Sequence, residues 1–157
     1  IAASTGSLGH GVGLAAGIAL VEKKNRIYVL MSDGELHEGS VWESVMFISS
    51  NKLNNIVLII DNNNLQSSTR ATDTHPTMYP IDLKFKAFGW DAMTLNGHNN
   101  REIFQKLSKN SKKPMALIAK TIKGYPISFM KNVAKWHYRS PTQEEYLKAI
   151  MELNNEK

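Results

Sequence analysis

Two apolar segments that end in polar residues decide the fold of this chain. Residues 26–34 read RIYVLMSDG, and residues 55–64 read NIVLIIDNNN. Each is a short apolar run bounded by polar residues, and the second is rich in β-branched side chains, which is typical of a strand buried on both faces of a sheet. We therefore predict buried strands over residues 26–32 and 55–61.

Segments with helical character alternate with these strands along the chain. Residues 9–23 combine small apolar side chains with glycine, which suits a helix that packs closely against a neighbour. Within residues 41–50, apolar side chains recur at helical spacing. Further helices are predicted near 82–88 and over 99–109, and further strands over 91–95 and 115–121. Such alternation favours an α/β fold, in which a parallel sheet carries helices on both faces.

Two segments lie outside this alternation. The polar stretch 62–80 contains three consecutive asparagines and two prolines, and it is long enough to predict a functional loop. Near the end of the chain, Ser140 followed by Pro141 and Gln143 is typical of a helix start, with serine as the N-cap. We therefore predict a last helix over residues 142–153.

The composition is that of one ordinary domain. The chain has 157 residues, of which 42% are apolar, and this is enough for one hydrophobic core. It contains no cysteine, so it can form neither a disulfide nor a thiolate zinc site, and we expect it in the cytoplasm. Because it opens at Ile1 directly into a glycine-rich turn, we also expect a fragment or domain of a longer protein.

Charge and hydropathy argue against two kinds of partner. The longest apolar run covers residues 11–21 and is far shorter than the roughly 20 residues that span a bilayer. A net charge of +5 is shared by many enzymes and does not by itself indicate a nucleic-acid partner. We therefore predict that the chain binds neither a membrane nor a nucleic acid.

The glycines near the start of the chain allow two interpretations. Gly11, Gly13 and Ala16 match the G-x-G-x-x-A form of a dinucleotide-binding fingerprint. That fingerprint requires a strand immediately before it, and residues 1–4 are barely long enough to form one. The alternative is that the glycines only permit close helix packing and a tight turn.

The ends of the two buried strands carry oxygen-bearing side chains. Asp33 follows the first strand, and Asn63 follows the second. Because ligands bind at the carboxyl ends of parallel strands, these residues could share one crevice and hold Mg²⁺ together with phosphate oxygens. Gly34 would let the backbone approach such an anion closely. The alternative is that Asp33 and Asn63 only cap turns.

Four segments resemble the transketolase family. The sequence SDG at 32–34 followed by NNN at 62–64 looks like the thiamine-diphosphate signature GDG…NN. TGSLGHG at 5–11 and SDGELHEGSVWE at 32–43 resemble further family motifs, as does KTIKGYPISFMKNVAKWHYRSP at 120–141. The resemblance runs nearly end to end. It implies the thiamine-diphosphate-binding fold over residues 1–157, as the diphosphate-end domain of a fragment or subunit of a larger enzyme.

The resemblance assigns roles to individual residues. Asp33, the Asn63 side chain and the Leu65 carbonyl match the ligands of the metal, which is Mg²⁺ or alternatively Ca²⁺ or Mn²⁺. His137 matches a catalytic histidine that faces both the diphosphate and the substrate. Glu38 and Glu43 match carboxylates that connect two active sites across a dimer. The positions that match cofactor contacts are Gly6, Leu8, Gly34, Glu38, Ile122 and His137.

The activity that the resemblance implies is transfer of a two-carbon ketol unit from a ketose to an aldose. The partner would be a pyrimidine-binding domain or subunit, in a homo-oligomer or heterotetramer, and the substrates would be sugars or sugar phosphates. The alternatives are another thiamine-diphosphate enzyme, such as a deoxyxylulose-phosphate synthase relative, a non-catalytic anion-binding module, and a dinucleotide-binding domain. Two departures from the family pattern are Ser32 in place of glycine, and Tyr138 with Arg139 in place of small residues.

Overall fold

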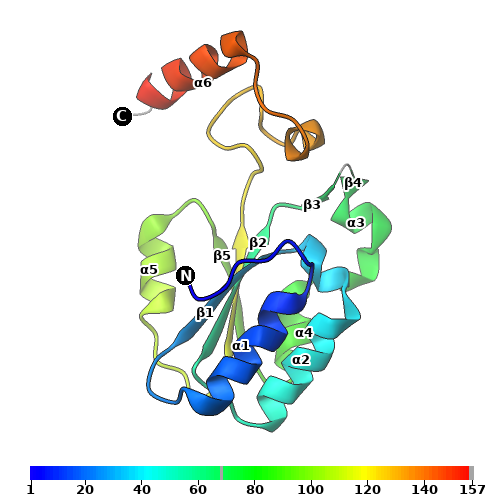
Figure 1. Ribbon diagram of the computed structural model, residues 1–157, viewed down its shortest axis with the longest axis vertical. Helices are drawn as coiled ribbons and strands as arrows, with labels where there is room; N and C mark the ends of the chain where they lie inside the picture. Colours follow the sequence, from blue (N-terminus) through cyan, green and yellow to red (C-terminus); the bar gives the residue numbers. More distant parts are fainter. Residues whose placement is uncertain (68, 156–157) are drawn as a thin grey trace.

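The centre of the chain is a four-stranded parallel sheet. The computed structural model describes residues 1–67 and 69–155. The strands are β1 (Ile27–Ser32), β2 (Ile56–Asn62), β5 (Asp91–Asn96) and β6 (Met115–Lys120). They lie in the order β1-β2-β6-β5, and every neighbouring pair is parallel (Figure 1). The predicted α/β fold is therefore confirmed, and the register places Ser32 beside Asp61.

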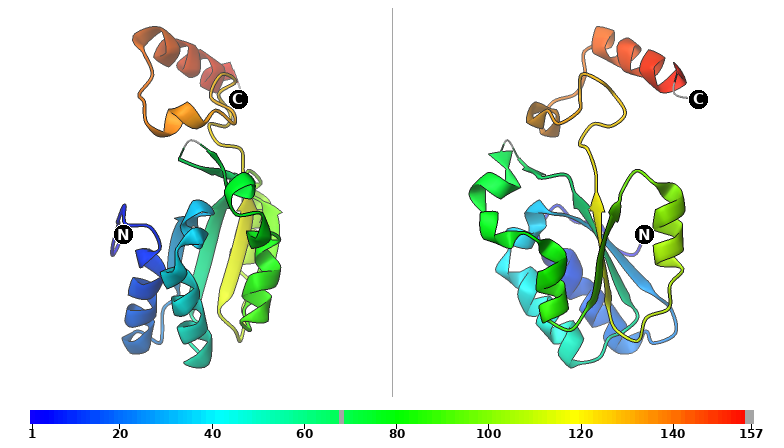
Figure 2. Two further views of the ribbon diagram at one scale, coloured as in Figure 1. Left: turned by 90° about the vertical axis from the view of Figure 1, so that its right-hand side faces the viewer. Right: turned by 180° about the vertical axis from the view of Figure 1, so that it is seen from behind.

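Helices cover both faces of this sheet. The helices are α1 (His10–Val21), α2 (Gly39–Ser50), α4 (Ile81–Ala87) and α5 (Asn100–Leu107). Helices α1, α2 and α4 lie on one face, whereas α5 lies on the other (Figure 2). The larger core forms between the three helices and the sheet and contains Ile48, Leu58 and Phe85; the smaller core packs against α5 through Ile103. No helix within the described residues is long and apolar enough to cross a membrane.

The polar stretch predicted as a loop contains short elements. It holds a two-stranded hairpin, β3 (Leu65–Gln66) with β4 (Thr69–Arg70), followed by α3 (Ala71–Thr74) and η2 (Pro76–Met78). Asn64 organises this segment, because its backbone oxygen accepts from the Ala71 N–H and its Oδ1 accepts from the Thr72 N–H. Its φ of 60° lies in the left-handed region that asparagine tolerates. The asparagines thus close a turn rather than leave the segment irregular.

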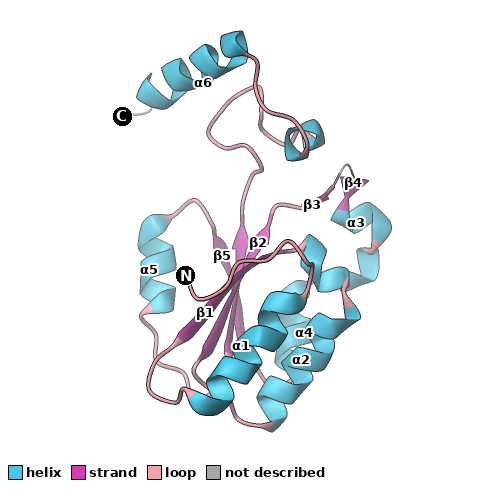
Figure 3. Cartoon of the chain, in the orientation of Figure 1, coloured by secondary structure: helices cyan, strands magenta, loops and turns pink. Residues whose placement is uncertain are grey.

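The chain beyond β6 forms an arm that extends past the carboxyl ends of the strands. It contains η3 (Ala134–His137) and α6 (Gln143–Asn155), joined by loops (Figures 1 and 3). The predicted last helix is confirmed, but the prediction of Ser140 as its N-cap is wrong. The Thr142 Oγ1 accepts from the Glu145 N–H, and the Glu145 carboxylate accepts from the Thr142 N–H. This reciprocal pair satisfies free N–H groups of the first turn, so the helix begins at Gln143.

The structure also decides how the first glycines act. Residues 1–5 form no strand, so the strand that a dinucleotide fingerprint requires before Gly11 and Gly13 is missing from this position. Gly13 lies within α1, where an added Cβ would stand 3.4 Å from the Ser44 Oγ of α2. The interpretation as close helix packing therefore holds.

Candidate functional site

The site lies where β1, β2 and β6 end side by side. Asp33 follows β1, Asn63 follows β2, and Thr121 follows β6. The Asn64 N–H donates to the Asp33 Oδ2 at 2.7 Å, which joins the first two strand ends directly. The parallel register therefore brings these three strand ends, which are far apart in the sequence, into one cluster.

Asp33 has the environment of a cation ligand. Its side chain is 1% exposed, and its Oδ1 is buried without a hydrogen-bond partner among residues 1–67 and 69–155. Burial, with a smaller contribution from the nearby Asp61 carboxylate, raises the pKa of the Asp33 carboxyl from 3.8 to about 6. An unpaired buried carboxylate oxygen is costly, and a divalent cation would compensate it.

Asp61 orients the amide of Asn63. The Asn63 Nδ2 donates to the Asp61 Oδ2 at 3.2 Å, and the Asn63 Oδ1 accepts from the Leu65 N–H at 2.9 Å. The Thr121 hydroxyl donates to the other oxygen of Asp61. Because an ionised carboxylate can only accept, the amide nitrogen must face Asp61 and the amide oxygen must face away from it. The oxygen keeps a second lone pair for a hard cation.

The donor set fits a cation that is shared with a phosphate ligand. Asp33 contributes one carboxylate, Asn63 an amide oxygen, and Leu65 a backbone carbonyl, all of which are hard oxygen ligands. Within the described residues, no three histidine or acidic side chains form a group that could hold a metal. Mg²⁺ commonly takes one or two carboxylates and completes its shell with phosphate and water oxygens. These residues therefore suit Mg²⁺ bound with a diphosphate.

Gly34 lies in the tightest part of the site. It is buried at the start of η1 (Gly34–His37), and a Cβ at this position would stand 3.1 Å from the Gln66 Cβ. Ser32, the residue that departs from the family glycine, is accommodated at the end of β1. A side chain at position 34 would push β3 away from the cluster, so the glycine allows the two turns to pack closely.

The other predicted contacts lie outside the Asp33 cluster. Gly6 and Leu8 are exposed in the turn before α1, and Glu38 is exposed at the N-cap of α2. Ile122 is 39% exposed, and its N–H donates to the His98 Nε2 at 2.8 Å.

His137 is exposed on η3, within the arm, where its ring lies edge-on to the Tyr138 ring. The arm stands beyond the strand ends, on the side of the molecule where the Asp33 cluster lies (Figure 1). The predicted catalytic position is therefore at the carboxyl-end side of the sheet but carried by a separate segment.

Sequence reasoning missed Tyr79. Its hydroxyl lies 3.4 Å from the Asp33 Oδ2, to which it donates, and burial together with the Asp33 charge raises the pKa of Tyr79 to about 12. The phenol therefore stays protonated and remains a donor to Asp33. Its sequence neighbourhood, between η2 and α4, carries no pattern that relates it to β1, so the contact exists only in the folded chain.

The raised pKa of Asp33 predicts how stability depends on pH without metal. The folded pKa of about 6 lies above the unfolded value of 3.8, so the protonated form contributes its stability fully below about pH 4, and this contribution is lost as the pH rises through about 6. Asp33→Asn cannot ionise. Its free energy of unfolding should therefore rise relative to wild type by about 3 kcal/mol between pH 4 and pH 7.

Urea unfolding of both proteins at these two pH values, with chelator present, measures this change. A difference between wild type and Asp33→Asn that does not vary with pH would contradict the raised pKa.

Comparison with known proteins identifies the domain. The family model described as transketolase, thiamine diphosphate binding domain, matches residues 1–153. A chain of the two-part apulose-4-phosphate transketolase of Phocaeicola vulgatus is 39% identical, with 98% of this chain aligned to 57% of that relative. Human transketolase is 40% identical over 85% of this chain and 22% of its own length. The chain thus spans little more than half of the first relative and about a fifth of the second.

The solved structures agree with these sequence matches. The transketolase of Campylobacter jejuni superimposes with a TM-score of 0.75 at 28% identity, over 92% of this chain and 24% of that chain. The match to the family model extends over both turns that form the Asp33 cluster. The chain belongs to the transketolase family, as its thiamine-diphosphate-binding domain.

Proposed function

We propose that this chain provides the diphosphate and metal half of a transketolase active site, which transfers a two-carbon ketol unit from a ketose to an aldose. The observation that carries the proposal is the buried Asp33 carboxylate, whose Oδ1 has no hydrogen-bond partner among the described residues. It lies beside the Asn63–Asn64 turn at the strand ends of a domain that belongs to this family. Metal-assisted diphosphate binding explains why such a carboxylate is kept in the interior.

Mg²⁺, or alternatively Ca²⁺ or Mn²⁺, is held by Asp33, the Asn63 amide oxygen and the Leu65 carbonyl. Gly34 lets the backbone approach the diphosphate closely. When bound, thiamine diphosphate supplies the nucleophilic carbon and the electron sink for breaking and forming the carbon–carbon bond. The chain's own residues bind, orient and exclude water around it.

The remaining contacts come from the edges of the site. Gly6 and Leu8 line the aminopyrimidine, and Ile122 packs near the cofactor rings. Glu38 takes part on the pyrimidine side. His137 is the catalytic residue of this chain and holds or donates a proton at the substrate oxygens. The position of His137 on an extended arm supports this role, because an exposed imidazole can meet a substrate that enters from solvent.

A pyrimidine-binding domain or partner chain completes the site, in a homo-oligomer or a heterotetramer. The groove between α1 and α2 supports a partner here: its lining includes Gly13, Gly17 and Glu43, together with the exposed side chains of Leu20 and Phe47. Small residues permit close approach, and a carboxylate such as Glu43 can share a proton across an interface. Two of the relatives bear names that describe them as one part of a transketolase made of several chains.

The substrates of the assembled enzyme are a ketose donor and an aldose acceptor, as sugars or sugar phosphates. The names of two relatives specify different sugars, apulose-4-phosphate and 6-deoxy-6-sulfo-D-fructose. In this chain Tyr138 and Arg139 lie next to His137 and are exposed, so they are positioned to influence which sugar is accepted. We also propose a cytoplasmic location, because the chain has no cysteine.

The 157-residue chain should be inactive alone. Its motifs account for the diphosphate end of the cofactor, whereas activation also requires a carboxylic acid that contacts the pyrimidine ring from the partner. The test is an assay with thiamine diphosphate, Mg²⁺ and a panel of ketose donors, before and after the pyrimidine-binding chain is added. Activity should appear only in the mixture. Steady turnover by the isolated chain would refute the division of the site.

A further inference from the structure

A single carboxylate joins two turns that are far apart in the sequence. The Glu35 Oε2 accepts from the Gly9 N–H, and the Glu35 Oε1 accepts from the Ser32 N–H, each at 3.0 Å. Gly9 ends the turn that carries Gly6 and Leu8. Ser32 immediately precedes the proposed metal ligand Asp33. Glu35 therefore connects the proposed aminopyrimidine turn to the proposed metal turn.

The bond to Ser32 is reciprocal. The Ser32 Oγ accepts from the Glu35 N–H at 3.3 Å while the Ser32 N–H donates to the Glu35 carboxylate. This is the geometry of a capping box, and it fixes the direction in which the Glu35 side chain leaves η1. Because the glutamate is held at its base, its second oxygen has a defined position at which to receive the Gly9 N–H.

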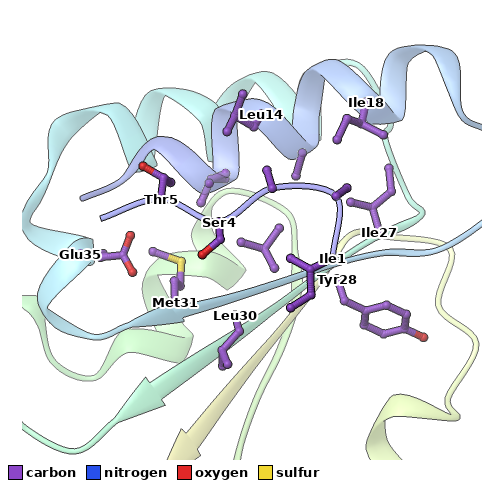
Figure 4. A pocket seen from close by; sticks show the side chains of 16 residues that line it. Ile1, Ser4, Thr5, Leu14, Ile18, Ile27, Tyr28, Leu30, Met31 and Glu35 are labelled. Atoms are coloured by element: carbon purple, nitrogen blue, oxygen red, sulfur yellow. The ribbon is translucent and has the colours of Figure 1, made fainter. Parts of the chain in front are cut away.

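Gly9 has little freedom to move away from this carboxylate. Its φ is +76°, and an added Cβ would stand 2.8 Å from the Ser40 Oγ and 2.9 Å from the Glu38 Cβ. The start of α2 thus bounds the turn on one side, and Glu35 holds its N–H on the other. Figure 4 shows the Glu35 side chain directed into a cavity of about 450 Å³, whose lining also includes Thr5 of the same glycine-rich segment.

We infer that Glu35 is a positioning residue for the cofactor: by accepting from Gly9 and Ser32 together, it sets the spacing between the aminopyrimidine turn and the metal turn before the cofactor binds. The inference rests on the proposed function. A turn that is already placed loses less conformational freedom on binding, so the effect of Glu35 is on affinity. Glu35 acts through the backbone of the two turns and has no part in proton transfer.

The test is Glu35→Gln in the enzyme assembled from this chain and its pyrimidine-binding partner. Glutamine keeps the length of the side chain, but its amide has one acceptor oxygen, so it cannot accept from both N–H groups in the same way. At saturating Mg²⁺, the dissociation constant for thiamine diphosphate should rise by about tenfold. The turnover number at saturating cofactor should stay within about twofold of wild type, and the exchange of the Gly9 amide hydrogen should become faster.

The matched control is Glu102→Gln. Glu102 also accepts a backbone N–H, from Asn96 at 3.2 Å, but at the opposite edge strand of the sheet. Its loss should leave the affinity for thiamine diphosphate within about twofold of wild type. If Glu35→Gln does not fold, Glu35→Asp serves instead, because the shorter side chain keeps the charge but cannot reach both N–H groups; it should weaken affinity in the same direction.

The outcomes separate the inference from the proposed function. Wild-type enzyme that fails to bind thiamine diphosphate with Mg²⁺ would overturn both. Wild-type enzyme that binds it, with a Glu35 variant that folds and binds equally well, would overturn the positioning role alone. A Glu35 variant whose turnover number falls while its cofactor affinity is unchanged would also overturn that role, because positioning of the turns predicts the reverse pattern.

Discussion

Asp33→Ala and Asn63→Ala should each abolish Mg²⁺-dependent binding of thiamine diphosphate and leave the fold intact. Each change removes one of the few hard oxygen ligands that the chain offers, and diphosphate and water oxygens cannot replace the lost carboxylate or amide. The Asp33 carboxylate is buried beside Asn64, so its removal leaves the metal without its charged protein ligand. Calorimetric titration of the assembled enzyme with thiamine diphosphate, with and without Mg²⁺, measures the loss.

Asn62→Ala is the matched control for this experiment. It removes the same amide one residue earlier, at the last position of β2, where consecutive side chains point to opposite sides. It should bind the cofactor as wild type does. Circular dichroism of all three variants establishes that the fold is retained. Unchanged cofactor affinity in Asp33→Ala or in Asn63→Ala would contradict the metal assignment.

His137→Ala should lower the turnover number by about 10² to 10⁴, which is the usual effect of removing a positioned acid or base. Its effect on cofactor affinity should be smaller, because the metal and diphosphate ligands lie in the Asp33 cluster and not on the arm. His137 is exposed on η3, so the substitution leaves no cavity in the core. Steady-state kinetics at saturating cofactor, together with cofactor titration, separates the two quantities.

Lys135→Ala is the control for His137. Lys135 lies in the same short helix and is exposed, and its ammonium group lies over the Trp136 ring, 5.5 Å from the ring centroid. Its removal tests whether a general disturbance of η3 lowers turnover, and wild-type activity is expected. Wild-type turnover in His137→Ala would reduce His137 to a packing residue of the arm.

Much of the fold could be predicted because its signals are local. The apolar runs that became β1 and β2 are bounded by polar residues, and the helical spacing of Val41, Val45 and Ile48 marks the face of α2 that is buried. The order of the strands could not be read in this way. β6 lies between β2 and β5, although β5 comes before it in the sequence, because pairing depends on contacts that are distant along the chain.

Local signals were also ambiguous where two caps competed. Ser140 and Thr142 both stand before the last helix, and both are good N-cap residues. The structure selects Thr142 because Glu145, three residues later, completes the reciprocal hydrogen bonds. The same S/T-x-x-E spacing occurs at Ser32 and Glu35, where it is a readable sign of the capping box that holds the Glu35 carboxylate.

The sequence by itself determined the alternation of strands and helices, the family, and the types of donor at the strand ends. Tertiary structure alone decided how those donors are presented. Asp61 orients the Asn63 amide within a turn that Thr121 of another strand end supports, Tyr79 donates to Asp33, and Glu35 joins two turns. Hydrogen bonds are directional and short, so they depend on a register that no local pattern specifies.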